Sequence, residues 1–137
     1  MRKKRNRNRI WIAVMLTGTM FMWLTGFNTV NAASKFGTFI AGGEIVNASL
    51  TGDANGATGS TSYTKGPGQV EVMVGGEAKV PGSTQMVGLV AMPDAVNTPG
   101  GVSATITPPA GMVLISAHSS HYATINGNSN SYSITLF

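Results

Sequence analysis

Two histidines, His118 and His121, are the side chains of this sequence best suited to acid–base or metal chemistry. Residues three apart on a continuous strand point to opposite faces, so the two rings can share a metal ion only if the chain turns at Ser119-Ser120. His121 with a serine and an acid would make a hydrolytic triad, but no Gly-x-Ser-x-Gly elbow is present. We therefore expect two solvated histidines at a loop edge, with no metal site.

Two carboxylates, Glu71 and Glu77, are the nearest approach to the acid pair of a glycoside hydrolase. We expect a hairpin here, with a three-residue loop from Gly75 to Glu77 and with Lys79 diagonal to Glu71. That arrangement predicts a solvated charge pair. No arginine follows residue 32, and no phosphate-binding or dinucleotide-binding fingerprint occurs. The sequence therefore predicts no catalytic residue, no cofactor and no enzymatic activity.

Three tyrosines are the candidate ligand-contact residues: Tyr63, Tyr122 and Tyr132. Aromatic rings stack on sugar faces, and neighbouring asparagines offer hydrogen bonds, so a cell-wall glycan is one candidate partner. Both tryptophans, the larger rings, lie in the first 32 residues at positions 11 and 23, which weakens this hypothesis.

An apolar segment near residue 34 is the candidate interaction segment, with Phe36, Phe39 and Ile40 as its contact residues. Ala41-Gly42-Gly43 follows it and is interpreted as a hinge. The segment either forms the first strand of its own domain or adds to the edge of a second copy of the chain. Both alternatives stay open.

The first 32 residues have the layout of a secretory signal. Six cationic residues lie between positions 2 and 9, an apolar helical segment runs from Ile10 to about Phe27, and small residues lead up to Ala32. A retained anchor is the alternative, since a bilayer is spanned by ~20 apolar residues. We expect residues 1–32 to be a cleaved signal peptide, the protein to be secreted or associated with the cell surface, and membrane contact to occur only during export unless the signal is retained.

Charge and cysteine content narrow the classes of partner. The whole chain has a net charge of +4, but only three lysines remain after residue 32, against five carboxylates, which gives −2. Nucleic-acid binding needs clustered Lys and Arg, so we predict none. The chain has no cysteine, and therefore burial or assembly must supply the stability that disulfides give many small exported domains.

Apolar residues alternate with polar ones almost throughout residues 33–137, which is the period of a β-strand. Four runs share this pattern: Val46/Ala48/Leu50, Val70/Val72/Val74, Val102/Ala104/Ile106 and Tyr132/Ile134/Leu136. Two further runs, 86–91 and 112–115, are apolar on both faces and predict strands buried between layers. Residues 51–60 are rich in Gly and polar residues and predict a loop, and Asn126-Gly127 predicts a hairpin turn.

These patterns predict about eight strands in one all-β domain at 33–137, a small β-sandwich of jelly-roll or immunoglobulin-like type. The favoured function is a secreted, non-catalytic structural module that associates with itself on a surface or in a matrix. The alternatives are a toxin or bacteriocin-like protein acting on membranes, and a glycan or cell-wall binding module.

The exported protein is expected to begin at Ala33, because Val30 and Ala32 occupy the two small-residue positions before the cut. N-terminal sequencing of secreted material measures this directly. A secreted or surface form that still begins at Met1 would contradict the prediction and indicate a retained anchor.

Overall fold

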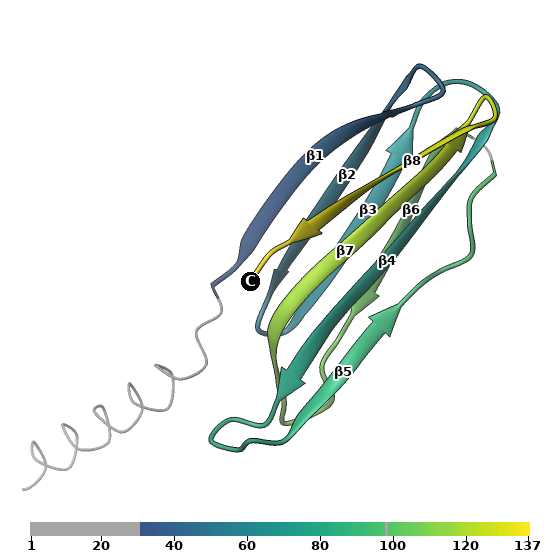
Figure 1. Ribbon diagram of the computed structural model, residues 1–137. Coiled ribbons are helices and arrows are strands. Elements are labelled where there is room, and N and C mark those ends of the chain that lie inside the picture. The colour runs from purple at the N-terminus through teal and green to yellow at the C-terminus, as the bar shows by residue number, and fades with distance from the viewer. Residues whose placement is uncertain (1–30, 98) are drawn as a thin grey trace, which may run out of the picture.

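The computed structural model describes residues 31–97 and 99–137, and eight strands lie within them (Figure 1). The strands are β1 (Ala33–Ala41), β2 (Glu44–Asp53), β3 (Gly56–Tyr63), β4 (Gly68–Lys79), β5 (Met86–Ala91), β6 (Gly100–Ile106), β7 (Val113–Ile125) and β8 (Asn128–Thr135). The predicted signal peptide, 1–32, lies outside the described residues except for its last two. In the described part of the chain, no helix is long and apolar enough to cross a membrane.

The strands form two four-stranded antiparallel sheets that pack face to face (Figure 1). The first sheet has the order β1-β2-β3-β6 and the second the order β5-β4-β7-β8, so the predicted all-β class is confirmed. The order differs from that of the constant-type immunoglobulin domain, in which the first, second, fourth and fifth strands share a sheet. The reason is local: two-residue connections keep β1, β2 and β3 together as a meander, and only β6 joins them later.

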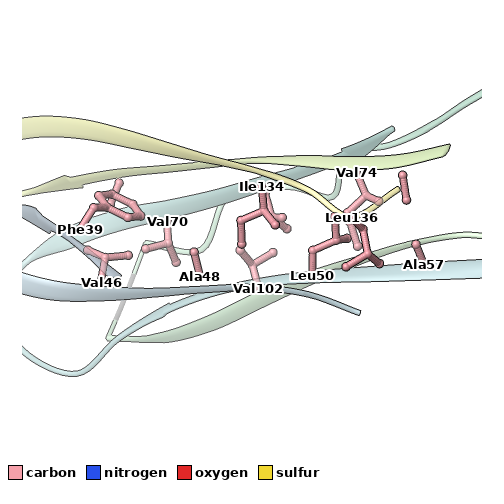
Figure 2. Packing of buried hydrophobic residues seen from close by; sticks show 14 of the residues in the cluster. Phe39, Val46, Ala48, Leu50, Ala57, Val70, Val74, Val102, Ile134 and Leu136 are labelled. Atoms are coloured by element: carbon pink, nitrogen blue, oxygen red, sulfur yellow. The ribbon is translucent and has the colours of Figure 1, made fainter. Parts of the chain in front are cut away.

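The predicted alternation is confirmed by burial, because each apolar run lies on the inner face of its strand. Val46 and Leu50 on β2, and Val70 and Val74 on β4, have no exposed surface. Figure 2 shows these side chains meeting those of the opposite sheet in one continuous core. Full burial of one Val or Leu stabilises the fold by roughly 1.5–3 kcal/mol, so a core of this kind can hold a cysteine-free domain together.

The predicted turn at Gly75-Gly76 is wrong, because β4 runs straight through both residues. Each glycine instead permits a close approach within the sheets. A Cβ on Gly75 would lie 2.6 Å from Nε2 of His118, and a Cβ on Gly76 would meet the carbonyl of Ser116. The only irregularity is a shift of register between Glu77 and Ala78. Paired glycines therefore mark close contacts here and not a reversal of the chain.

The predicted loop at residues 51–60 is also wrong. These residues form the end of β2 and most of β3, joined by a two-residue connection in which Asn55 N donates to Asp53 Oδ1 over 2.7 Å. On the inner face of β3, Gly59 packs closely against the second sheet, while Thr58, Ser60 and Ser62 lie on the outer face. A Cβ on Gly59 would come within 2.7 Å of Val74 Cγ2.

The strand at 86–91 is not buried between layers. It is β5, the outermost strand of the second sheet, and most of its residues are exposed. The other run, 112–115, behaves as predicted only at Leu114, which has no exposed surface while Val113 and Ile115 are half-buried. Apolar content alone did not distinguish an edge strand from a central one.

The predicted hinge at Gly42-Gly43 is the tight turn of the β1–β2 hairpin, with φ of 57° and 82°. The predicted Asn126-Gly127 turn is confirmed, and both of its residues have positive φ as the short hairpin requires. The two turns are joined, because Asn126 Nδ2 donates to the Gly42 carbonyl over 3.0 Å. Within the single chain, β1 pairs with β2 along its whole length and forms the first strand of its own domain.

Gly42 and Gly43 give a matched test of this turn. Gly43→Ala should destabilise the fold by about 1–2 kcal/mol, the usual effect of a side chain in the left-handed region, since its Cβ would meet nothing. Gly42→Ala should destabilise it by about 3 kcal/mol or more, because its Cβ would also collide with the Ile125 carbonyl. Equilibrium urea unfolding of both variants measures the difference, and equal losses would contradict the contact between the two turns.

Candidate functional site

The most elaborate polar cluster of the molecule surrounds His121, which lies on the inner face of β7 with no exposed surface. Thr61 Oγ1 on β3 lies 2.7 Å from its Nδ1, and Ser119 Oγ, two residues earlier on β7, lies 2.7 Å from its Nε2. Thr61 Oγ1 also donates to the Glu71 carbonyl on β4 over 3.0 Å. The cluster therefore links the two sheets through their shared core.

The hydrogen bonds determine which nitrogen of His121 carries the proton. The single hydroxyl hydrogen of Thr61 is used at the Glu71 carbonyl, so Thr61 must accept from Nδ1–H. Nε2 is then the acceptor, and the Ser119 hydroxyl donates to it. Every member is satisfied when the imidazole is neutral. Burial lowers the pKa of His121 to about 4, and a backbone hydrogen bond with Ser60 opposes part of that shift.

Ser119 and His121 resemble the nucleophile and base of a hydrolase only in the distance between them. A substrate must reach the serine oxygen, but Ser119 has only 1% of its surface exposed and faces the opposite sheet. The position that the acid of a triad would occupy, at Nδ1 of His121, is taken by the hydroxyl of Thr61. The geometry therefore suits a structural bridge between the sheets.

The predicted loop-edge position of the histidines is wrong, because both lie inside β7, where the register against β4 and β8 is unbroken around them. They point to opposite faces: His121 is buried, and His118 lies on the outer face over Gly75. They cannot ligate one ion. Within residues 31–97 and 99–137, no group of three His, Cys, Asp or Glu side chains could hold a metal ion.

The predicted juxtaposition of Glu71, Glu77 and Lys79 is also wrong, because β4 does not turn between them. Glu71 and Glu77 lie six residues apart on one extended strand, roughly 20 Å at the usual rise per residue. Carboxyl pairs in glycoside hydrolases lie about 5–9.5 Å apart. These two carboxylates cannot act together.

The three tyrosines lie in three different environments and do not form one aromatic surface. Tyr63 is buried, and its hydroxyl has no hydrogen-bond partner among the described residues. Tyr122 is 40% exposed on the outer face of the second sheet, where hydrogen bonds with Ser129 and then Thr124 lower the pKa of its phenol. Tyr132 stacks on Phe39 with ring centroids 6.2 Å apart.

The predicted interaction segment is divided by the alternation of β1. Phe39 is buried in the core, whereas Phe36 is 76% exposed and Ile40 63% exposed on the outer face of the first sheet. The edge of β1 is partly occupied: Lys35 Nζ donates to the Thr135 carbonyl over 2.6 Å, and Asn130 Nδ2 donates to the Ile40 carbonyl over 2.8 Å. Side chains thus tie β1 to β8 of the other sheet.

The opposite edge of the second sheet is open and apolar, and we call it the β5 edge. Its exposed side chains are Met86 (55%), Val87 (36%), Val90 (70%) and Met92 (73%). One side of β5 pairs with β4 from Val74 to Lys79, and no described strand pairs with the other side. The remaining half of the β4 edge is covered, because Val96 and Val70 exchange two backbone hydrogen bonds of 3.0 and 3.1 Å.

A second open feature, the outer groove, lies on the outer face of the first sheet and has a volume of about 460 Å³. It is lined by Phe36, Gly37, Thr38, Asn47, Ala48, Ser49, Ser60 and Ser62. Sequence reasoning missed it because β3 was interpreted as a loop. The alternation of Ala57, Gly59 and Thr61 with polar neighbours was the available signal.

A comparison of the chain with protein-family models found no match, and neither did a comparison with curated proteins.

His121 predicts a stability that depends on pH below neutrality. Its pKa is about 4 in the folded chain and about 6.5 in the unfolded chain, so the unfolded state binds the proton more readily between these values. The free energy of unfolding should be level above pH 6.5 and then fall by about 1.4 kcal/mol per pH unit from this group as the pH drops toward 4.

Urea unfolding between pH 7.5 and 5, where carboxylates contribute little, measures this slope. His121→Gln should remove it, and His118→Gln, at an exposed histidine three residues away, is the matched control. If the slope survives in His121→Gln, another group titrates and the burial of a neutral imidazole is not its cause.

Proposed function

We propose that the chain is an exported, non-catalytic β-sandwich module that assembles with copies of itself through the β5 edge. The single observation that carries this proposal is the composition and exposure of β5. Its sequence is Met-Val-Gly-Leu-Val-Ala, without a charge, a proline or a polar side chain, on an edge that no described strand covers. The signal-like leader supports export.

An open edge strand presents unpaired backbone N–H and C=O groups to any extended chain. Monomeric proteins usually blunt such edges with lysine, proline or a covering segment. The β1–β8 side of this molecule has such devices in Lys35 and Asn130. The segment around Val96 covers half of β4 in the same way. Two edge strands remain that pair with no further described strand, β5 and β6. The exposed residues of β6 are Gly, Ser and Thr, whereas β5 exposes large apolar side chains and has no device of this kind.

A second β5 is the partner that suits this edge best. Two copies of one strand can pair antiparallel about a two-fold axis, so that each copy supplies the same residues to the other. The exposed Val90 and Met86 side chains would then be covered from the partner's side. Pairing would extend the second sheet from four strands in each copy to one continuous eight-stranded sheet.

Two other functions, a membrane-acting toxin and an enzyme, have weaker support. A membrane-acting toxin needs a basic surface for anionic lipid, but the described residues contain three lysines, and Lys35 already donates to a backbone carbonyl. An enzyme needs a reachable nucleophile or acid, and the close Ser119–His121 pair is buried.

A lysine on the β5 edge should separate the copies. Val90→Lys should shift the monomer–oligomer equilibrium toward monomer by about tenfold or more, because pairing would place the charge against the apolar side chains of the second β5, and an edge lysine is one of the devices that block such pairing. Ile45→Lys is the matched control, since Ile45 is 61% exposed but lies on β2 inside the first sheet.

Sedimentation velocity over a range of concentrations measures both variants beside the wild type. A wild-type protein that stays monomeric at the highest concentration would overturn self-association. An assembly that persists in Val90→Lys and dissociates in Ile45→Lys would assign the contact to a different surface.

A further inference from the structure

The outer face of the first sheet presents ordered rows of hydroxyl groups across its strands. Ser49, Ser60 and Ser103 are directly opposite one another in neighbouring strands, and so are Thr51, Thr58 and Thr105. Ser60 and Ser103 share a hydrogen bond of 2.7 Å between their hydroxyls, and Thr58 and Thr105 share one of 2.8 Å. These cross-strand bonds link the side chains of β3 and β6 along the outer face.

The outer groove lies on this same face, beside Phe36. Phe36 is directly opposite Ser49, so a large ring stands beside a strand that carries only small side chains at that level. Thr38 and Asn47, also directly opposite each other, continue the groove by one step along the strands. The hollow therefore follows from the sequence: one aromatic residue on the edge strand borders a floor of serines.

The polar groups of the groove are available to a ligand. Within the described part of the chain, no hydrogen bond engages the side chains of Thr38, Asn47, Ser49 or Ser62. The Asn47 amide offers two donors and an acceptor, and each hydroxyl offers one donor and two acceptors. Phe36 keeps 76% of its surface exposed and so leaves the ring face free for stacking.

We propose that the outer groove binds a neutral, extended oligosaccharide. No lining residue carries a charge, so the groove has nothing to pair with a phosphate, a sulfate or a uronic acid carboxylate. An uncharged sugar matches this surface, because its ring face stacks on an aromatic side chain while its hydroxyls bond to amides and hydroxyls. The volume of about 460 Å³ lies in the range of ~300–1,000 Å³ that is usual for small-molecule sites.

The shape of the face further selects the ligand. A groove on the outer face of a sheet suits a ligand chain that is itself extended, as β-1,4-linked glucans are. A coiled α-1,4-linked glucan would contact the face with fewer residues. The site does not depend on the proposed self-association, because the groove lies on the first sheet and β5 belongs to the second.

Isothermal titration calorimetry of the purified protein with cellohexaose tests the proposal, with maltohexaose as the shape control. We expect cellohexaose to bind at least tenfold more tightly than maltohexaose. Phe36→Ala should weaken cellohexaose binding by about tenfold, the usual contribution of one aromatic contact, and Phe36→Tyr should retain it. Asn47→Ala should weaken it several-fold. Tyr122→Ala, at an exposed aromatic residue on the other sheet, should leave binding unchanged.

Three results would overturn the proposal: no heat of binding with cellohexaose at millimolar concentration, equal affinity for both sugars, or unchanged affinity in Phe36→Ala. A fourth would do so as well, if Phe36→Ala breaks an oligomer and leaves sugar binding intact, since the face would then be a protein interface. Because Phe36 is exposed, the Phe36→Ala variant should unfold at the same thermal midpoint as the wild type, which excludes unfolding as the cause of weaker binding. Val90→Lys should keep the affinity of each groove, so the two proposals fail independently.

Discussion

The close approach of the two sheets at the centre of the molecule is the constraint on which the other features depend. Gly59 on β3 leaves no room for a side chain, because a Cβ there would lie 2.7 Å from Val74 Cγ2 and 3.4 Å from Ser119 Cβ. With the sheets this close, His121 is held between Thr61 and Ser119 as a neutral, doubly hydrogen-bonded group. A charged imidazole would lose its acceptor role toward Ser119 and its hydration together. The close packing of the two sheets therefore requires that His121 stay neutral.

The narrow core also explains why the two sides of the molecule differ. On one side, β1 and β8 pack against each other across the sheets, and Lys35 and Asn130 can reach the backbone of the opposite strand. On the other side, β5 pairs with only the second half of β4, and the following segment returns to cover the first half through Val96. The chain that could have covered β5 is used to cover β4. The apolar, uncharged β5 edge therefore stays uncovered, because the segment that follows β5 pairs with β4.

Alternation could be predicted from the sequence wherever large β-branched residues marked the inner face, as on β2, β4 and β6. It could not be predicted on β3, where small residues occupy most of the inner face and Gly59 in particular lies too close to Val74 of the opposite sheet to carry a side chain. The turn predicted at Gly75 and Gly76 was wrong because a single sequence does not distinguish a glycine in a strand from a glycine in a turn. The exposure of β5 depends on strand order, which a pattern of apolar residues does not contain. The buried His121 bridge was missed because its partner Thr61 is sixty residues away in the sequence, and no local pattern brings the two together.

The two proposed surfaces are arranged so that one can strengthen the other. Antiparallel pairing of two β5 strands places the two-fold axis perpendicular to the second sheet, so both first sheets lie on the same side of the joined sheet. The two outer grooves would then face the same direction from one rigid assembly. A single groove with one aromatic contact would bind a glycan weakly, whereas a second groove held nearby would bind the same long polymer at a high effective concentration. Self-association of a module with a weak site for a repeating neutral glycan is therefore a physical route to firm attachment on a polymer surface, without any additional contact within each site.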